Sequence, residues 1–222
     1  MSLYEIEIKS LLGTKDKADS LRQKISEQGG ALVSKNNQLN HYFTVSNVDK
    51  FKKNLSKHIN LDKKESFEKI LNEGSNFSIR TRDTDGEVKL VVKASIGSDS
   101  SSNGVSRMEF EDRVGIVLNE LDKLLLDAGL EYQAKWSRER EEYKLSDMNI
   151  CVDKNAGYGY LAEFEKVVED KSSADSVKNK LLEIMEAFGV AELPQDRLER
   201  MFSHYNTNWK DYYGTDKVFT IQ

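Results

Sequence analysis

Like-charged residues spaced two apart along alternating stretches constrain the fold of this chain more than any other feature. Residues 3–9 place Glu5, Glu7 and Lys9 on one side of the chain and Ile6 and Ile8 on the other. Because successive side chains of a strand point to opposite faces, this alternation predicts a β-strand with one buried and one polar face. Seven further strands are predicted at 31–44, 77–82, 87–94, 107–113, 131–145, 149–153 and 159–167. The residues Asp83-Thr84-Asp85-Gly86 predict a hairpin turn between the strands at 77–82 and 87–94.

Helices are predicted at 16–28, 49–71, 115–127 and 172–188, and after Pro194 through about Tyr205, where apolar residues recur at helical spacing. The two halves share an order of strand, helix, glycine stop and strand, and Glu109-x-Glu111-x-Arg113 opens the second half much as residues 5–9 open the first. An internal repeat of this kind suggests a pseudo-symmetric closed sheet. We therefore predict an α+β fold, mainly β, with a closed eight-stranded antiparallel barrel and outer helices.

Composition excludes several classes of function. The 222 residues carry a net charge of −5, which argues against general nucleic-acid or membrane binding, so no DNA and no membrane partner is expected. The single cysteine, Cys151, excludes an internal disulfide and favours a reducing, cytoplasmic location. Cys151 follows apolar residues in a predicted strand and is expected in the core. No apolar run approaches the ~18 residues of a membrane span.

Carboxylate pairs and basic pairs are segregated onto different predicted strands. The carboxylate pairs are Glu5/Glu7, Glu109/Glu111 and Glu163/Glu165, and the basic pairs are Arg80/Arg82, Lys89/Lys93 and Arg138/Arg140. A solvated sheet also alternates, but it mixes its polar residues, whereas like charges on one strand face repel unless opposite charge lies between them. A metal triphosphate would supply both charges, since Lys and Arg bind phosphate oxygens and carboxylates bind Mg²⁺.

Phosphoryl transfer depends on positioning and charge neutralisation, so this chemistry requires no serine or cysteine nucleophile. The three histidines, His41, His58 and His204, show no metal-ligand spacing and are expected in surface or packing roles.

Ordered motifs extend this pattern along most of the chain. Glu5-Ile6-Glu7-Ile8-Lys9 matches an ExExK signature near the N-terminus. The later motifs are Phe77-Ser78-Ile79-Arg80-Thr81-Arg82, Lys89 to Lys93, Arg107-Met108-Glu109-Phe110-Glu111, Arg138-Glu139-Arg140-Glu141-Glu142-Tyr143, Asp153 followed by Glu163-Phe164-Glu165, and Ser203-His204-Tyr205. With these motifs, the chain resembles the CYTH superfamily of triphosphate tunnel metalloenzymes.

The resemblance implies a site in which each charged strand has a role. One or two Mg²⁺ or Mn²⁺ ions would be held by Glu5, Glu7, Glu109, Glu111, Asp153, Glu163 and Glu165. The triphosphate would be bound by Lys9, Arg80, Arg82, Lys89, Lys93, Arg107, Lys135, Arg138, Arg140 and Tyr205. Catalytic roles fall on Glu7, Lys9, Glu163 and Glu165. Arg138 stands where the family more often has lysine, so either Arg138 or Lys135 is expected to contact phosphate.

The resemblance assigns residues 1–206 to the triphosphate tunnel domain and leaves an aromatic tail at 207–222. The tail is expected to pack on or near the barrel; covering a tunnel mouth or mediating a homodimer are the alternatives. The helical stretch 49–71 has no obvious counterpart in the minimal family pattern.

Three functions are open at this stage. Known CYTH members include thiamine, inorganic and RNA triphosphatases and class IV adenylyl cyclases. We rank first the metal-dependent hydrolysis of a small triphosphate, which is inorganic tripolyphosphate or a nucleoside or thiamine triphosphate. A class IV-like adenylyl cyclase ranks second because the sequence shows no adenine pocket. A non-catalytic triphosphate- or polyphosphate-binding module ranks third because the carboxylate pairs are intact.

Overall fold

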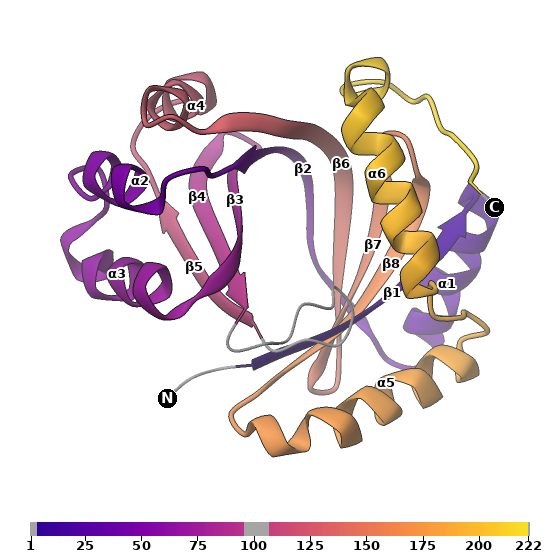
Figure 1. Ribbon diagram of the computed structural model, residues 1–222. Coiled ribbons are helices and arrows are strands. Elements are labelled where there is room, and N and C mark those ends of the chain that lie inside the picture. Colours follow the sequence, from indigo (N-terminus) through magenta and orange to yellow (C-terminus); the bar gives the residue numbers. More distant parts are fainter. Residues whose placement is uncertain (1–3, 96–106, 222) are drawn as a thin grey trace. The chain divides into compact units, whose positions relative to one another are not determined.

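The computed structural model describes residues 4–95 and 107–221 (Figure 1). The strands are β1 (Tyr4–Gly13), β2 (Ala31–Thr44), β3 (Ser75–Thr84), β4 (Glu87–Ser95), β5 (Arg107–Arg113), β6 (Glu131–Leu145), β7 (Met148–Asn155) and β8 (Gly159–Val168). The helices are α1 (Lys15–Glu27), α2 (Val48–Leu55), α3 (Lys64–Glu73), α4 (Leu118–Asp127), α5 (Ala174–Ala187) and α6 (Gln195–Tyr212), with 3₁₀ turns at Leu61–Lys63 and Lys171–Ser173. The predicted mainly-β α+β class is confirmed.

The eight strands form one sheet in the order β1-β8-β7-β6-β2-β3-β4-β5. The registers of β1 with β8, β8 with β7, β7 with β6, β2 with β3, β3 with β4 and β4 with β5 are all antiparallel. Among the described residues the order ends at β1 and β5, so closure of the sheet into a barrel stays a prediction. No helix in this part of the chain has the length and apolar character needed to cross a membrane.

The chain divides into two compact units. Unit 1 comprises the described residues up to 37 and from 137 onward, and unit 2 comprises the described residues between them. The strands β2 and β6 contribute residues to both units.

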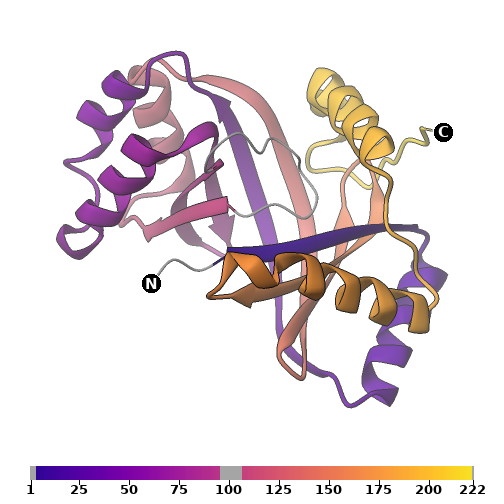
Figure 2. The same ribbon diagram turned by 60° about the horizontal axis from the view of Figure 1, so that its bottom comes forward.

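The core of unit 1 lies where α1 and α5 pack against β1 and β8 (Figures 1 and 2). Ile6 and Ile8 on β1 contribute the apolar side of the alternation, and Phe164 on β8 and Leu21 on α1 are fully buried with them. In Figure 2 the orange helix α5 runs beside the indigo strand β1. Because the helices cover the apolar face of these strands, Glu5, Glu7 and Lys9 belong to the opposite, polar face.

The core of unit 2 lies between strands β3–β5 and helices α2, α3 and α4 (Figure 1). Phe51 from α2, Phe67 from α3 and Phe110 from β5 are buried together, with ring centroids 5.8 Å and 5.1 Å from Phe67. The predicted helical stretch 49–71 is two helices, because α2 ends at Leu55 and α3 begins at Lys64. Each helix buries its own apolar stripe on the sheet.

Local signals explain several boundaries. The Thr14 hydroxyl accepts a hydrogen bond from the Lys17 amide and caps the first turn of α1, and Asn47 caps α2 in the same way. The predicted hairpin turn joins β3 to β4 through Asp85 and Gly86, which have φ of 48° and 92°. Two positive φ angles define the type I′ turn that suits a two-residue hairpin, and glycine adopts such angles without strain.

The C-terminal helix is longer than predicted. Helix α6 continues past Tyr205 to Tyr212, and Leu198, Met201 and Tyr205 form its buried stripe. Beyond the helix, the Gly157 amide donates to the Lys217 carbonyl at 2.9 Å, and the Phe219 amide donates to the Gly157 carbonyl at 2.8 Å.

Candidate functional site

The polar face of unit 1 carries a cluster of eight charged side chains, which we call the first charged cluster. They come from β1, β6, β7 and β8 and comprise Glu5, Glu7, Lys9, Arg138, Arg140, Asp153, Glu163 and Glu165. Register brings these residues together: Glu7 lies opposite Glu165, Lys9 opposite Glu163, and Arg140 opposite Asp153. Side chains directly opposite in an antiparallel pair share a face, so residues from four separate strands build one polar surface.

Asp153 organises the two arginines of this cluster. Its side chain is only 1% exposed. Arg140 donates to it through Nε at 2.8 Å and Nη2 at 2.7 Å, and Arg138 Nη1 donates at 2.9 Å. This two-pronged contact fixes the plane of the Arg140 guanidinium. Burial alone would lower the pKa of Arg140, but the negative charges of Glu163 and Asp153 outweigh burial and raise it.

Glu163 is the carboxylate most strongly paired with cations. Arg140 donates a short hydrogen bond to it, and Lys9 Nζ lies 3.8 Å from its Oε1. Burial would raise the pKa of Glu163, but the charges of Arg140, Lys9 and Arg138 hold it well below its usual range. Glu163 is therefore ionised at neutral pH.

Glu165 lies in the opposite electrostatic environment. Its Oε1 accepts a 2.8 Å hydrogen bond from the neutral Asn149 amide, and within the described residues no cation lies within ion-pair distance of it. Burial raises the pKa of Glu165, the Asn149 hydrogen bond opposes this shift, and the charges of Glu5 and Glu163 add to it. The Glu165 end of the cluster thus has excess negative charge.

Unit 2 carries a second charged cluster on β3, β4 and β5. Its members are Arg80, Arg82, Lys89, Lys93, Glu109 and Glu111. Lys93 lies directly opposite Glu109, and their side chains approach to 3.3 Å. Lys89 lies 2.7 Å from Glu111, and Arg82 lies 3.4 Å from the same carboxylate. The segregated acidic and basic strands therefore neutralise one another across the sheet, which the alternation within single strands does not reveal.

The pKa shifts of the second charged cluster follow from these pairs. The hydrogen bond to Glu111 raises the pKa of Lys89. Burial would raise the pKa of Glu111, but Lys89 and Arg82 outweigh it and lower the pKa. Both groups are charged at neutral pH, so a phosphate group would have to compete with Glu111 for Lys89.

Two polar side chains on β2 orient the arginines of this cluster and were missed by the sequence analysis. The Arg80 Nη1 donates to the Tyr42 hydroxyl at 2.7 Å, and its guanidinium lies 5.5 Å from the Tyr42 ring centroid. The Arg82 Nε donates to the Asn40 Oδ1 at 3.0 Å. Tyr42 and Asn40 are two residues apart, so the same alternation that identified the arginines could have identified them.

Three further predicted site residues do not lie in either cluster. Lys135 lies 3.9 Å from Asp122 and 4.2 Å from the Tyr132 ring centroid. Tyr205 is fully buried beside Tyr158, with ring centroids 5.6 Å apart, and burial raises the pKa of its hydroxyl. Both residues stay predictions as phosphate ligands.

The third residue, Arg107, pairs with Ser95 at the end of β5, and its side chain lies outside the described part of the structure.

Cys151 is buried in the core, as predicted. It is directly opposite Glu163 and so lies on the polar face beneath the first charged cluster. Burial raises the pKa of its thiol. His41 is buried in a packing role: its Nδ1 lies 2.6 Å from Asp122 Oδ2.

The carboxylate oxygens at the Glu165 end of the first charged cluster are hard donors, which are the ligands that Mg²⁺ and Mn²⁺ prefer. Among the described side chains, no group of three or more His, Cys, Asp or Glu residues is placed to hold a metal ion. Mg²⁺, however, usually takes one or two carboxylates and fills its other positions with water and substrate phosphate. Glu7, which is paired with Lys9, and Glu165 are two such carboxylates. Burial and the charges of Glu5 and Glu163 raise the pKa of Glu165.

The structure is thus an α+β protein whose single antiparallel sheet of eight strands has charged polar faces and helices on its outside. The family model for the CYTH domain matches residues 67–197, more than half of the chain. The chain therefore belongs to the CYTH domain family. No curated protein sequence matches it.

Solved structures share this fold at low sequence identity. The PH1819 protein of Pyrococcus horikoshii is similar with a TM-score of 0.62 and 19% identity, over 89% of this chain and 99% of that one. A "putative adenylate cyclase" of Vibrio parahaemolyticus has a TM-score of 0.62 and 14% identity, over 91% and 99% of the two chains. A "putative adenylyl cyclase" of Hippeastrum, for which a dominant triphosphatase activity is stated, has a TM-score of 0.51 and 16% identity, over 85% and 89%. At these identities the likeness is one of fold.

Proposed function

We propose that this chain is a divalent-metal-dependent enzyme that hydrolyses a triphosphate, either inorganic tripolyphosphate or a nucleoside or thiamine triphosphate. The observation that carries the proposal is the opposition of Glu7 and Glu165 across β1 and β8. Like charges placed opposite each other are unfavourable. Lys9 is paired with Glu7, whereas among the described residues Glu165 accepts only from the neutral Asn149 amide and has its pKa raised by burial and by the charges of Glu5 and Glu163. A cation beside Glu165 would relieve this repulsion. The closed barrel and its triphosphate tunnel are part of this proposal.

Glu7 and Glu165 would bind the metal ion, and Glu5 on the same face of β1 would add negative charge close to it. A bound Mg²⁺ or Mn²⁺ supplies charge neutralisation and polarises the phosphoryl group. The metal roles of Asp153 and Glu163 are weaker proposals, because Arg138 and Arg140 hold Asp153 and Arg140 holds Glu163.

Phosphate binding would be the task of the basic side chains. Within the described residues the Nη1 of Arg140 makes no hydrogen bond, although Nε and Nη2 are held by Asp153. A guanidinium fixed on one edge presents its other donors in a defined direction, which suits recognition of phosphate oxygens. Lys9, Arg80, Arg82, Lys89 and Lys93 are the further phosphate contacts that we propose.

Hydrolysis then needs little beyond positioning. Water attacks the terminal phosphorus, the bond to the bridging oxygen breaks, and orthophosphate and the remaining diphosphate leave. The basic side chains neutralise the charge that builds up on the departing diphosphate. Lys9 lies opposite Glu163 and is paired with Glu7. In this proposal its ammonium group contributes to the neutralisation of the departing diphosphate.

A class IV-like adenylyl cyclase is the second candidate, and one observation favours it. The rings of Tyr42 and Trp136 lie edge to face with centroids 6.4 Å apart, beside Arg80. Aromatic rings next to a phosphate-binding arginine offer a surface on which a nucleobase could stack. This reaction releases pyrophosphate and cyclic AMP from ATP, so its products separate it from the first candidate.

The experiment is a product analysis by ³¹P NMR and chromatography. The protein is incubated with tripolyphosphate, ATP and thiamine triphosphate, each with Mg²⁺ and with Mn²⁺. Release of orthophosphate from at least one substrate, dependent on the metal, is the expected result. Cyclic AMP with pyrophosphate would establish the second candidate instead. Binding without turnover would refute both enzymes and leave the non-catalytic module.

A further inference from the structure

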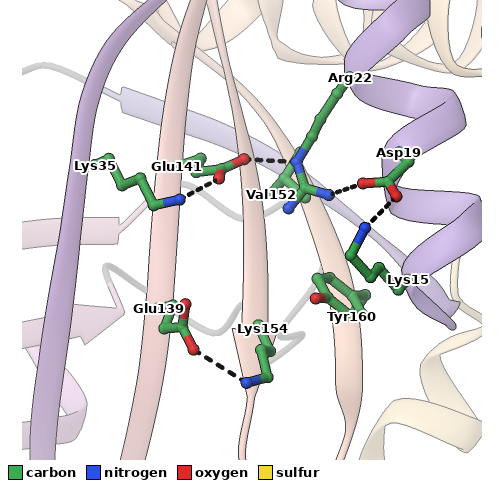
Figure 3. Close-up of a pocket in the computed structure, with 9 residues that line it drawn as sticks. All are labelled: Lys15, Asp19, Arg22, Lys35, Glu139, Glu141, Val152, Lys154 and Tyr160. Carbon is green, nitrogen blue, oxygen red and sulfur yellow. Dashed lines mark hydrogen bonds and ion pairs between the residues drawn. The ribbon is translucent and has the colours of Figure 1, made fainter.

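A pocket of about 340 Å³ lies on the face of unit 1 opposite the first charged cluster (Figure 3). Glu139 and Glu141 of β6 line it, whereas Arg140 between them belongs to the cluster. Lys154 of β7 lines it, whereas the preceding Asp153 belongs to the cluster. Since neighbouring residues of a strand point to opposite faces, these strands carry two separate charged surfaces.

Four cations and three carboxylates line this pocket, and a fourth carboxylate, Asp216, pairs with Lys154 from outside the lining. The cations are Lys15, Arg22, Lys35 and Lys154, and the carboxylates are Asp19, Glu139 and Glu141. They come from α1, β2, β6 and β7, so the pocket is built by tertiary structure and not by one run of basic sequence. Its remaining lining residues are Val152 and Tyr160.

The carboxylates are already supplied with donors. Glu141 accepts from Arg22 Nε at 2.6 Å, from Lys35 Nζ at 3.1 Å and from the Tyr143 hydroxyl at 3.0 Å. Burial would raise the pKa of Glu141, but the hydrogen bonds from Arg22 and Lys35 outweigh burial and lower it. Glu141 is therefore ionised, and its carboxylate already accepts hydrogen bonds from three donors.

The other two carboxylates are paired in the same way. Asp19 accepts from Lys15 Nζ at 2.5 Å and from Arg22 Nη1 at 2.7 Å. Glu139 accepts from Lys154 Nζ at 3.0 Å, and Lys154 also lies 2.7 Å from Asp216. A ligand that enters the pocket consequently meets few acceptors that still need a donor.

Donors, in contrast, are left over. An arginine has five N–H groups and a lysine has three. Arg22 Nε donates to Glu141 and its Nη1 donates to Asp19, and the guanidinium also interacts with the Tyr143 hydroxyl. The Tyr160 hydroxyl makes no hydrogen bond within the described residues, and the Arg22 guanidinium lies 5.6 Å from the Tyr160 ring centroid. Lys15 and Lys35 each donate one hydrogen bond there and are 70% and 62% exposed. In Figure 3 the Arg22 guanidinium lies between Glu141 and Asp19, and Tyr160 lies between Lys15 and Lys154.

Surplus donors from several directions suit an anion with many acceptor oxygens. A planar carboxylate would satisfy one arginine fork, whereas a tetrahedral phosphate can accept from a guanidinium, two ammonium groups and a hydroxyl together. The volume lies at the lower end of small-ligand pockets, which run from about 300 to 1,000 Å³. We propose that this pocket binds a small phosphate anion, orthophosphate or pyrophosphate, at a site separate from the triphosphate site.

The test uses pyrophosphate as the probe, with ¹⁵N-labelled full-length protein and EDTA present. Backbone amide shifts are followed at Lys35, Lys154 and Tyr160, so the readout reports on the pocket itself and does not depend on turnover. The double variant Lys15→Gln, Lys35→Gln removes two exposed ammonium groups. The matched control, Lys17→Gln, Lys180→Gln, removes two exposed lysines of unit 1 that do not line the pocket. Tyr160→Phe removes the hydroxyl alone.

Saturable shifts at these amides are expected in the native protein and in the control. In the double variant the affinity should fall on the order of tenfold, from two charge interactions. Tyr160→Phe should weaken binding by a smaller factor. An absence of shifts at millimolar pyrophosphate would overturn the proposal, as would equal affinity in the double variant and the control. Metal-dependent turnover is measured in a separate experiment. A failure of pyrophosphate to bind this pocket therefore does not refute the proposed hydrolysis, and a failure of hydrolysis does not refute this pocket.

Discussion

Glu7 on β1 lies directly opposite Glu165 on β8, on the polar face of unit 1. Glu163 and Glu165 are two residues apart on one strand, yet their pKa values shift in opposite directions. Burial favours a higher pKa for both, but the cations beside Glu163 outweigh burial and lower its pKa, whereas the pKa of Glu165 is raised. Glu163 has Arg140 and Lys9 beside it, whereas Glu165 has the neutral Asn149. Lys9 is also paired with Glu7, so Glu165 is the carboxylate of this opposed pair that has no cation within ion-pair distance among the described residues. Our account places the metal beside Glu165, at the Glu7–Glu165 pair.

Glu7→Gln should separate function from stability. Loss of a metal carboxylate is expected to reduce turnover by about a hundredfold or more. The substitution relieves the repulsion with Glu165 but also removes the ion pair with Lys9, so the free energy of unfolding should change by no more than about 1 kcal/mol. Steady-state kinetics and urea unfolding measure the two effects. Glu169→Gln, an exposed glutamate of the same unit, is the control and should change neither. Full activity in Glu7→Gln would remove Glu7 from the mechanism.

Arg80→Gln should weaken substrate binding. A charge-assisted hydrogen bond is worth about 1.5–3 kcal/mol, so KM should rise about tenfold or more. Tyr42→Phe keeps the ring but removes the hydroxyl that holds Arg80, and should give a smaller rise in KM. Kinetics over a range of triphosphate concentrations decide between the outcomes. If kcat and KM are both unchanged in Arg80→Gln, the second charged cluster does not bind the substrate.

Asp122 should control the acid stability of the protein. Its carboxylate is 2% exposed; the Thr81 and Tyr132 hydroxyls donate to it at 2.6 and 2.7 Å, and His41 Nδ1 lies 2.6 Å away. Burial would raise the pKa of Asp122, but the bonds from His41, Thr81 and Tyr132 outweigh burial and lower it. A lowered carboxyl pKa stabilises the fold above the usual aspartate value of about 3.9, and this contribution is lost as pH falls through the folded pKa.

Asp122→Asn should therefore lower the unfolding free energy at pH 7 by about 2–4 kcal/mol and flatten the loss of stability in acid. Urea unfolding between pH 3 and pH 7 measures both effects. Asp127→Asn on the same helix, paired with the exposed Lys123, should cost about 0.5 kcal/mol or less. Equal effects of the two substitutions would show that the buried network does not contribute as described.

Cys151 should be chemically silent in the folded protein. Its side chain is buried and its raised pKa leaves little thiolate at neutral pH. Ellman's reagent should react rapidly only after unfolding in guanidinium, and Cys151→Ala should retain turnover. A native protein that reacts as fast as the unfolded one would show that the thiol is accessible.

Local sequence signals predicted much of the fold. Alternation indicated which face of β1 is polar, and the turn-forming pair Asp85–Gly86 marked the β3–β4 hairpin. The break between α2 and α3 was missed because both helices present apolar residues at the same spacing. The extension of α6 was missed as well, because Asn206, Thr207 and Asn208 have low helix propensity and the buried stripe of the helix ends at Tyr205.

The candidate site was predictable residue by residue but not pair by pair. The alternation named Glu7, Glu163 and Glu165, yet which carboxylate meets a cation depends on strand register. Asn149 beside Glu165, and Glu141 paired with Arg22 across 119 residues of sequence, are contacts that only tertiary structure creates. The cross-sheet neutralisation of Glu109 by Lys93 has the same origin.

Mn²⁺ binding followed by electron paramagnetic resonance tests the central claim most directly. The free-Mn²⁺ signal is titrated with native protein, Glu165→Gln and Glu169→Gln, each with and without tripolyphosphate. Our account predicts that the native protein and Glu169→Gln deplete the signal, more strongly with tripolyphosphate, and that Glu165→Gln binds at least about tenfold more weakly. Equal depletion by all three proteins, or none by the native protein, would contradict the placement of a divalent metal at the Glu7–Glu165 pair.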